Sequence, residues 1–321
     1  MHSKAFPNLV SIEAFHAWRA NPSQWLPIAI DIARSHSLSC ADPHVFSNGS
    51  NLVVGLDPRL ILKIFPPMLR HQFVSERAAL SRLHGRLSVP IPQIVLEGER
   101  SRWPYLAMTR MDGVIGTEAW ARIPENQRES VLTQIGEIIA EVQRIPVGDL
   151  SHLQPQWMQF IPKQIEGCRA RHEQLDLSQK YLDGLDDLLQ DAATLIPMNA
   201  APVILTGEYN PENMLLSEHS GGWRLAGLID FGDAMTGWGE YDLLGPSTFM
   251  TEGRPGRVRS LLRGFGYSET NTDAALPRRL MALLLLHRYS NLEVQICIDG
   301  WQRKAADLYE LERLLWPIRW H

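Results

Sequence analysis

The sequence contains few cysteines and no long apolar run. Its 321 residues include three cysteines, Cys40, Cys168 and Cys297, without a CxxC pair. This odd number and wide spacing exclude a disulfide framework and favour a reducing compartment. The longest strongly apolar run, residues 280–286, is far shorter than the roughly 20 residues of a membrane-spanning helix. No basic segment followed by an apolar one opens the chain, so we expect a cytoplasmic protein without a signal peptide.

Basic residues are also fewer than acidic ones. There are 31 Lys and Arg residues against 36 Asp and Glu residues, which gives a formal net charge of −5 at pH 7. A general nucleic-acid-binding protein needs a basic face to contact phosphates, so this class is excluded. The small acidic excess suits a cationic partner, although a charge this small usually serves only solubility.

Apolar patterning divides the chain into a β-rich first third and a helical remainder. Helices are indicated by i, i+3/i+4 spacing, and strands by short apolar runs between turn signals. We therefore expect an α+β, bilobal fold with a small N-terminal lobe, 1–110, and a larger helical C-terminal lobe, 111–321. We expect residues 9–39 to be mostly helical and residues 69–84, 131–142 and 163–196 to be helical. The expected strands are 52–55, 60–65, 93–96, 105–109, 203–205, 214–216 and 225–229.

One lysine lies inside an apolar strand of the first lobe. Lys63 stands in Leu60-Ile-Leu-Lys-Ile-Phe65, where it either faces solvent or reaches a buried anion. Glu76 follows thirteen residues later in the next expected helix and is placed to form an ion pair with Lys63. A lysine fixed in this way holds the α- and β-phosphates of ATP in kinases. The turn 47–51, which contains Ser50, offers backbone N–H groups to a nucleotide, although such a turn is also ordinary.

Two polar segments of the second lobe each follow an apolar strand. The first, Thr206-Gly-Glu-Tyr-Asn-Pro-Glu-Asn213, contains Glu208 and Asn213, and Asp230 follows seventeen residues after Asn213. Amide and carboxylate oxygens are suitable ligands for Mg²⁺, so Asn213 and Asp230 are the candidate metal ligands. Glu208 is the candidate to orient an acceptor hydroxyl. Together with Lys63, these residues are the set that phosphoryl transfer from ATP or GTP requires.

These motifs resemble the aminoglycoside phosphotransferase family, which has a protein-kinase-like fold. Its loop reads roughly His-Gly-Asp-x-x-x-x-Asn, followed later by Ile-Asp-(Phe/Trp), and Thr206-Gly-Glu208…Asn213 and Ile229-Asp230-Phe231 stand in those places. The resemblance implies that the stretch 106–113 is the lobe linker, whose backbone meets the adenine near Thr109 and Met111. It also implies a structural role for Asp242, which holds the catalytic loop.

The resemblance further implies an ATP- and Mg²⁺-dependent kinase of a small cationic aminoglycoside, which acts as a monomer or weak dimer. Segments 103–113, 283–292 and 311–317 are most similar to hygromycin B phosphotransferases. A carboxylate-lined pocket would suit such a substrate, and its candidates are also consistent with solvated helix faces: Asp186, Asp187, Glu293 and Asp299.

Glu208 is the main departure from the family pattern, because the family has Asp there. Glutamate carries its carboxylate about 1.5 Å further from the backbone, one C–C bond more. Two alternatives therefore remain beside an aminoglycoside kinase. One is a kinase of another small metabolite, such as an amino alcohol or a sugar, and the other is a nucleotide-binding pseudokinase. A protein kinase is disfavoured, because the sequence has no His-Arg-Asp loop and no Ala-Pro-Glu segment.

Overall fold

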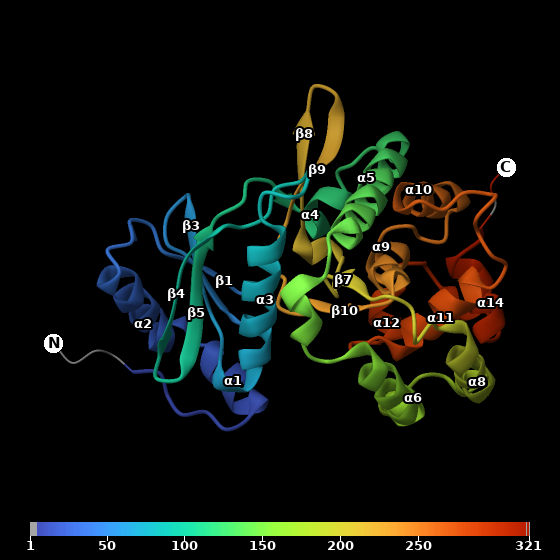
Figure 1. Ribbon diagram of the computed structural model, residues 1–321, viewed down its shortest axis with the longest axis horizontal. Helices are drawn as coiled ribbons and strands as arrows, with labels where there is room; N and C mark the ends of the chain where they lie inside the picture. The colour runs from blue at the N-terminus through green and yellow to red at the C-terminus, as the bar shows by residue number, and fades with distance from the viewer. Residues whose placement is uncertain (1–4, 319, 321) are drawn as a thin grey trace. The chain divides into compact units, whose positions relative to one another are not determined.

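The computed structural model describes residues 5–318 and 320, which form two compact units (Figure 1). The first unit contains the described residues up to Arg86 together with Pro90–Asp112 and Leu228–Ala234. The second contains Leu87–Val89, Gly113–Gly227 and the described residues from Met235 onward. The predicted α+β class, with a sheet-rich N-terminal part and a helical C-terminal part, is confirmed. The division into domains at residues 110 and 111 stays a prediction.

A five-stranded antiparallel sheet forms the centre of the first unit. Its order is β1-β2-β3-β5-β4, so the neighbours β3 and β5 are separated in sequence by a helix and by β4. Strand β4 is longer than the sequence predicted. It meets β5 through Ser101 and Arg102, which both have positive φ, as a tight hairpin turn requires. The strands are β1 His44–Phe46, β2 Leu52–Gly55, β3 Leu60–Ile64, β4 Ile94–Arg100 and β5 Trp103–Thr109.

The two faces of this sheet have different neighbours. Successive side chains of a strand point to opposite faces, so Leu62 and Ile64 share one face and Lys63 lies on the other. Leu62 and Ile64 belong to the hydrophobic core that includes α1 (Ile12–Arg19) and α2 (Pro22–Ser35). Lys63 meets α3 (Arg70–Leu83), which follows the 3₁₀ turn η1 (Pro67–Leu69).

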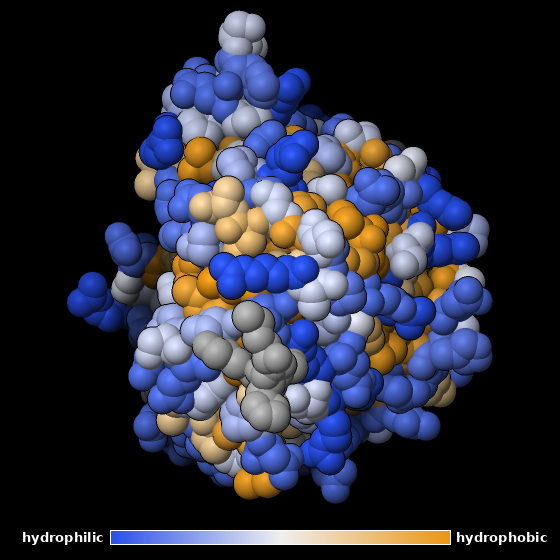
Figure 2. All heavy atoms as spheres, turned by 90° about the vertical axis from the view of Figure 1, so that its left-hand side faces the viewer, coloured by the Kyte–Doolittle hydropathy of each residue, from blue (hydrophilic) through white to orange (hydrophobic). Residues whose placement is uncertain are grey.

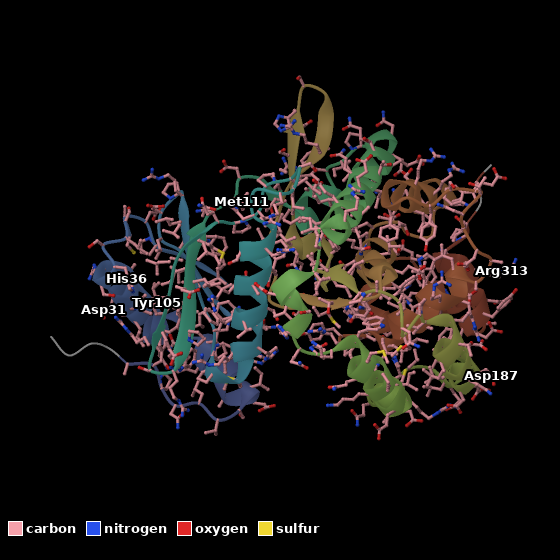
Figure 3. All side chains as sticks on the ribbon, viewed as in Figure 1. Asp31, His36, Tyr105, Met111, Asp187 and Arg313 are labelled. Carbon is pink, nitrogen blue, oxygen red and sulfur yellow. The ribbon has the colours of Figure 1, made fainter. Side chains whose placement is uncertain are left out.

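Helix α2 is tied to the sheet by polar contacts as well as by its apolar face. His36, directly after α2, lies 2.7 Å from the hydroxyl of Tyr105 on β5, between Nε2 and Oη (Figure 3). Asp31 of α2 accepts a bond from Arg100 of β4 at 2.7 Å. The N-terminal helices therefore cover the sheet face opposite Lys63.

Two small sheets and a set of helices form the second unit. Strand β6 (Val114–Ile115) pairs with β8 (Met214–His219), which pairs with β9 (Gly222–Leu228), and β7 (Val203–Leu205) pairs with β10 (Met235–Gly237). The helices are α4 Gly116–Trp120, α5 Glu125–Arg144, α6 Trp157–Gln174, α7 Gln179–Leu182, α8 Leu185–Leu195, α9 Leu244–Phe249, α10 Pro255–Phe265, α11 Leu276–Leu286, α12 Leu292–Gln295, α13 Trp301–Lys304 and α14 Leu308–Leu315, with 3₁₀ turns η2 Gly148–His152, η3 Pro211–Asn213 and η4 Gly239–Leu243.

Residues 163–196 are largely helical, as the sequence predicted. They form three helices, α6, α7 and α8, and the first break follows α6, where Asp176 adopts a left-handed backbone conformation with φ +55°. A residue with that φ cannot continue a right-handed helix. The predicted end before Pro197 is correct, since α8 ends at Leu195.

The apolar segment 280–286 lies inside the second unit, where every residue of it is buried in α11. Among the residues that the structure describes, no helix is long and apolar enough to cross a membrane. Figure 2 shows a face on which hydrophilic residues predominate and apolar residues form smaller areas.

Helices α5 and α10 lie side by side in the second unit, and glycines set their close approach (Figure 1). A Cβ added at Gly136 of α5 would collide with the Leu261 carbonyl oxygen and lie 2.6 Å from the Phe265 nitrogen of α10. A Cβ at Gly264 of α10 would collide with the Thr133 carbonyl oxygen. Because these neighbours are backbone atoms of helices, they cannot move aside locally.

We therefore predict that Gly136→Ala lowers the free energy of unfolding by about 1–3 kcal/mol, the usual cost of overpacking. Gly167→Ala in α6 is the matched control, because no atom lies within 4 Å of its added Cβ. Alanine is the better helix former, so the control should gain roughly 0.5–1 kcal/mol. Urea denaturation of both variants measures the two changes in unfolding free energy. If both variants gained stability, or both lost it, the close packing of α5 on α10 at Gly136 would not be what sets the difference.

Candidate active site

A buried ion cluster lies on the α3 side of the first unit's sheet. The Lys63 ammonium is 2.6 Å from Oε2 of Glu76 and 2.9 Å from Oδ1 of Asp230. Lys63 and Glu76 are 5% and 1% exposed, whereas a third of the Asp230 side chain remains accessible. The expected contact between Lys63 and Glu76 is therefore present. The structure adds Asp230, which the sequence analysis had assigned only to metal binding.

Burial and pairing oppose each other in this cluster. Burial alone would lower the pKa of Lys63, but the carboxylates of Asp230 and Glu76 outweigh it and raise that pKa. Burial raises the pKa of Glu76 to about 7, against the opposing effect of Lys63. For Asp230, burial is outweighed by Lys63, so its pKa is lowered. The ammonium thus stays charged and faces one partly accessible carboxylate.

Asp230 has a constrained backbone. Its φ is +60°, in the left-handed region that is uncommon for residues other than glycine. The turn lets Oδ1 accept the Gly232 N–H at 3.2 Å in addition to the bond from Lys63. Both contacts use Oδ1, which leaves Oδ2 for a ligand.

Ser50 lies in a network that the sequence analysis did not foresee. Its hydroxyl and the side-chain amide of Asn51 both donate to Oε1 of Gln72, at 3.1 and 2.9 Å. Gln72, on α3, in turn donates to Asp233 at 3.4 Å. The turn before β2 is therefore linked through α3 to the segment that carries Asp230. Gln72 lies four residues before Glu76, about one helical turn. This spacing puts both side chains on the same face of α3, and it was the sequence signal that could have identified Gln72.

Thr109 and Met111 lie at the end of β5, where the linker was predicted. Thr109 pairs with Leu60 in the sheet, and its hydroxyl accepts the Gln93 N–H at 2.8 Å. Met111 follows the strand and is partly buried (Figure 3). Their contact with a nucleotide base stays a prediction.

The candidate catalytic loop of the second unit is held by a buried carboxylate. Asp242, in η4, accepts the backbone N–H groups of Thr206 and Gly207, each at 3.0 Å. Burial raises the pKa of Asp242 to about 7, although the two N–H groups oppose this. The structural role expected for Asp242 therefore has a direct geometric basis, since the loop begins at these two amides.

His287, after α11, holds the same loop from another element. Its Nδ1 accepts the Tyr289 backbone N–H at 3.2 Å, so Nε2 carries the proton and donates to the Gly207 carbonyl at 3.3 Å. The ring also stacks on Tyr241, with centroids 4.8 Å apart. Burial lowers the pKa of His287 to about 4, so the ring is neutral near pH 7. The sequence analysis singled out His287 only through its segment and missed this contact.

Glu208 and Asn213 meet within the loop. The Asn213 side-chain amide donates to the Glu208 carbonyl at 3.2 Å and lies 3.5 Å from its Oε2. Asn210 begins η3 by accepting the Asn213 backbone N–H at 3.1 Å. Because Nδ2 of Asn213 faces Glu208, Oδ1 is left for a ligand. The loop thus presents a carboxylate and an amide oxygen together.

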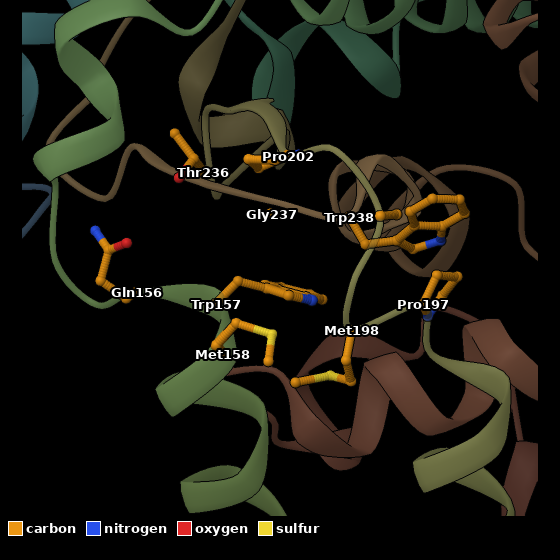
Figure 4. A pocket seen from close by; sticks show the side chains of 10 residues that line it. Gln156, Trp157, Met158, Pro197, Met198, Pro202, Thr236, Gly237 and Trp238 are labelled. Carbon is orange, nitrogen blue, oxygen red and sulfur yellow. The ribbon is translucent and has the colours of Figure 1, made fainter.

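Glu208 borders a cavity of about 250 Å³ in the second unit. Its other lining residues come from the catalytic loop, η4 and α9, and from the chain after α11: Gly207, Tyr209, Asn210, Tyr241, Leu244, Gly245, Phe249, His287, Tyr289, Asn291, Val294 and Gln295. A second cavity, of about 110 Å³, lies between Trp157, Trp238 and Met198 (Figure 4). No titratable side chain lines it. The cavity at Glu208 is therefore the better candidate for chemistry.

Removal of Lys63 should destabilise the protein more than removal of an exposed cation. Lys63→Met leaves buried Glu76 without its partner and should cost about 3–5 kcal/mol at pH 8. Adding Glu76→Gln removes the uncompensated charge and should recover at least about 1 kcal/mol. Arg77→Met on the same helix is the control, because both members of its pair with Glu97 are about half exposed and such pairs contribute at most about 1 kcal/mol. Similar losses from Lys63→Met and Arg77→Met, measured by urea denaturation, would contradict the cluster's role.

His287 should also make stability depend on pH. Its folded-state pKa of about 4 lies below the ordinary 6.5, so below pH 6.5 only the unfolded chain takes up the proton. Stability from this group is present above pH 6.5 and lost as pH falls towards 4, by up to about 3 kcal/mol. His287→Gln keeps a donor for Gly207 and should lack that loss. Denaturation at pH 7 and pH 4.5 measures the difference from the parent, and exposed His152→Gln is the control. If His287→Gln and the parent lost the same unfolding free energy between pH 7 and pH 4.5, this role of His287 would be refuted.

Comparisons with known proteins identify the family and the fold. The phosphotransferase enzyme family, APH, matches residues 43–283. No curated protein sequence matches significantly. Among solved structures, a complex of APH(2")-IIia with GDP and kanamycin has 20% identity and a TM-score of 0.67, over 81% of this chain and 89% of that chain. APH(3'')-Id from Streptomyces rimosus has 15% identity and a TM-score of 0.58, over 82% and 98% of the two chains. The macrolide 2'-phosphotransferase MphH from Brachybacterium faecium, as apoenzyme, has 14% identity and a TM-score of 0.56, over 82% and 90%.

The similarity to these structures confirms the predicted protein-kinase-like fold. The family match covers most of the chain, and it confirms the prediction of a phosphotransferase-type, small-molecule kinase enzyme. The residues that the motifs singled out stand within the matched range 43–283. We conclude that this chain belongs to the phosphotransferase enzyme family.

Proposed function

We propose that the protein transfers the γ-phosphoryl group of ATP or GTP to a hydroxyl of an aminoglycoside-type compound, with hygromycin B as the first candidate. The observation that carries this proposal is the placement of Glu208. Its carboxylate borders a 250 Å³ cavity on a loop that Asp242 and His287 hold from two elements. A fixed carboxylate beside a cavity is what an acceptor hydroxyl needs for orientation.

The proposed reaction exchanges one bond at phosphorus and moves one proton. The acceptor oxygen bonds to the γ-phosphorus, the bond from that phosphorus to the β,γ-bridging oxygen breaks, and the nucleoside diphosphate leaves. Glu208 orients the hydroxyl and takes its proton. Lys63, held by Glu76, contacts the α- and β-phosphates, and the backbone near Ser50, Thr109 and Met111 contacts the nucleotide.

The residues present suit a magnesium ion. Oδ1 of Asn213 and Oδ2 of Asp230 are hard oxygen ligands that the described hydrogen bonds leave available. When bound, the ion would neutralise charge on the transferring phosphates.

Solved relatives support nucleotide use and an aminoglycoside substrate. They include complexes with GDP and kanamycin, with ATP and streptomycin, and with ADP. Hygromycin B rests on the resemblance of segments 103–113, 283–292 and 311–317. The cavity at Glu208 is also of a size for a small sugar or amino alcohol, so a metabolite kinase is the second candidate.

The test is an incubation of the protein with ATP, Mg²⁺ and a panel of aminoglycosides that includes hygromycin B, followed by mass spectrometry of each compound. The proposal predicts a mass gain of one phosphate on at least one drug. Product only from sugars or amino alcohols would favour the metabolite kinase. Tight ATP binding without any product would identify a pseudokinase.

Glu208→Gln should lower kcat by about 100-fold or more with little change in the KM for ATP, because general-base assistance typically contributes 10²–10⁴-fold. Glu208→Asp should also be slower, since the shorter side chain withdraws its carboxylate from Asn213 and misplaces it by more than 1 Å. Glu212→Gln is the control, because Glu212 lies exposed in the same loop. Steady-state kinetics of the three variants measures these effects. A Glu208→Gln enzyme as active as Glu212→Gln would remove Glu208 from the mechanism.

A further inference from the structure

The cavity at Glu208 is poor in charge. Glu208 is the single carboxylate among its lining residues in the part of the chain that the structure describes, and no lysine or arginine lines it. His287 is neutral near pH 7, and its protonated nitrogen is engaged with Gly207. The amines of a polycationic substrate would therefore meet one carboxylate in this cavity, that of Glu208. In the proposed reaction this carboxylate already accepts the proton of the acceptor hydroxyl. A carboxylate that pairs with an ammonium is not available to accept a hydroxyl proton.

The carboxylates that were candidates for a cationic pocket lie elsewhere. Asp186 pairs with Arg169 at 2.9 Å, and Asp187 is exposed on α8 (Figure 3). Glu293 accepts a bond from Gln302 at 2.6 Å, and Asp299 is exposed. None of the four lines the cavity.

What the cavity offers instead is aromatic surface and carboxamides. Tyr289, 49% exposed, and the partly buried Phe249 supply rings, and Val294 is 66% exposed beside them. Gln295 is fixed by α12, because its Oε1 accepts the Asn291 backbone N–H at 3.0 Å. Its Nε2 is thereby left to donate to a ligand. The Asn291 carboxamide lies partly exposed at the start of the same helix.

The cavity volume limits what enters. A cavity of roughly 150 Å³ accommodates a benzene ring, so about 250 Å³ holds one substituted six-membered ring, and because the cavity is partly open a larger substrate can extend out of it. The remainder of a larger substrate would lie over Tyr289 and Val294, which are exposed and apolar.

We propose that the acceptor part of the substrate is a single hydroxylated ring with at most one ammonium group, which is recognised by Tyr289 and the carboxamides of Asn291 and Gln295. This inference rests on the proposed function, since it describes the acceptor of the same reaction. It makes Gln295 and Asn291 the residues that determine specificity. It also separates this enzyme from kinases that bind their substrates by clusters of carboxylates.

The test compares compounds graded by the number of amines on the accepted ring: neutral sugars and cyclitols, a monoaminocyclitol, hygromycin B and kanamycin. For the compound that is phosphorylated best, KM should change less than about twofold between about 50 and 500 mM salt, because no cluster of ion pairs is screened. Gln295→Ala should raise that KM about tenfold, the equivalent of one hydrogen bond of about 1.4 kcal/mol, with kcat nearly unchanged. Glu293→Gln and Asp299→Asn are the controls and should leave KM unchanged.

A KM that rises steeply with salt and with Glu293→Gln or Asp299→Asn, but not with Gln295→Ala, would overturn the inference. Calorimetric binding of the same compounds, in the presence of ADP, keeps the two proposals apart. If nothing is phosphorylated but ring compounds of low charge bind in a Gln295-dependent way, the proposed reaction fails and the recognition stands. If neither turnover nor Gln295-dependent binding is found, both fail.

Discussion

The buried carboxylate of Asp242 is the contact on which the second unit's candidate site depends. A carboxylate removed from water needs hydrogen-bond donors, and here the donors are the two backbone amides that open the loop. Because that requirement fixes Thr206 and Gly207, the position of Glu208 is largely set before any substrate binds. His287 adds a third bond, to the carbonyl of Gly207. Glu208 thus directly follows a residue, Gly207, whose backbone N–H and C=O are both hydrogen-bonded.

The first unit applies the same rule to a buried cation. Lys63 is stable in an apolar strand only because Glu76 and Asp230 neutralise it. Glu76 is enclosed, whereas Asp230 is partly accessible and keeps one oxygen for a ligand. The lysine is therefore paired with one enclosed carboxylate and with one that is partly accessible.

The sequence pattern predicted contacts between residues that are close together in the chain. Strand alternation and the spacing of thirteen residues were enough to pair Lys63 with Glu76. The contact of Lys63 with Asp230, 167 residues apart, depends on tertiary folding and left no pattern in the sequence. The same holds for His287 and Gly207, which are 80 residues apart. The end of α6 at Gln174 could not be predicted either, because a left-handed Asp176 marks it and no glycine or proline does.

The central claim is that this family member is an active phosphotransferase in spite of its glutamate at position 208. The most direct measurement follows nucleoside diphosphate and phosphate ester together by ³¹P NMR in one reaction with ATP, Mg²⁺ and an acceptor. The account predicts that a phosphate monoester of the acceptor appears in equal amount to ADP. Formation of ADP with inorganic phosphate alone, or no ADP in the presence of bound ATP, would contradict it.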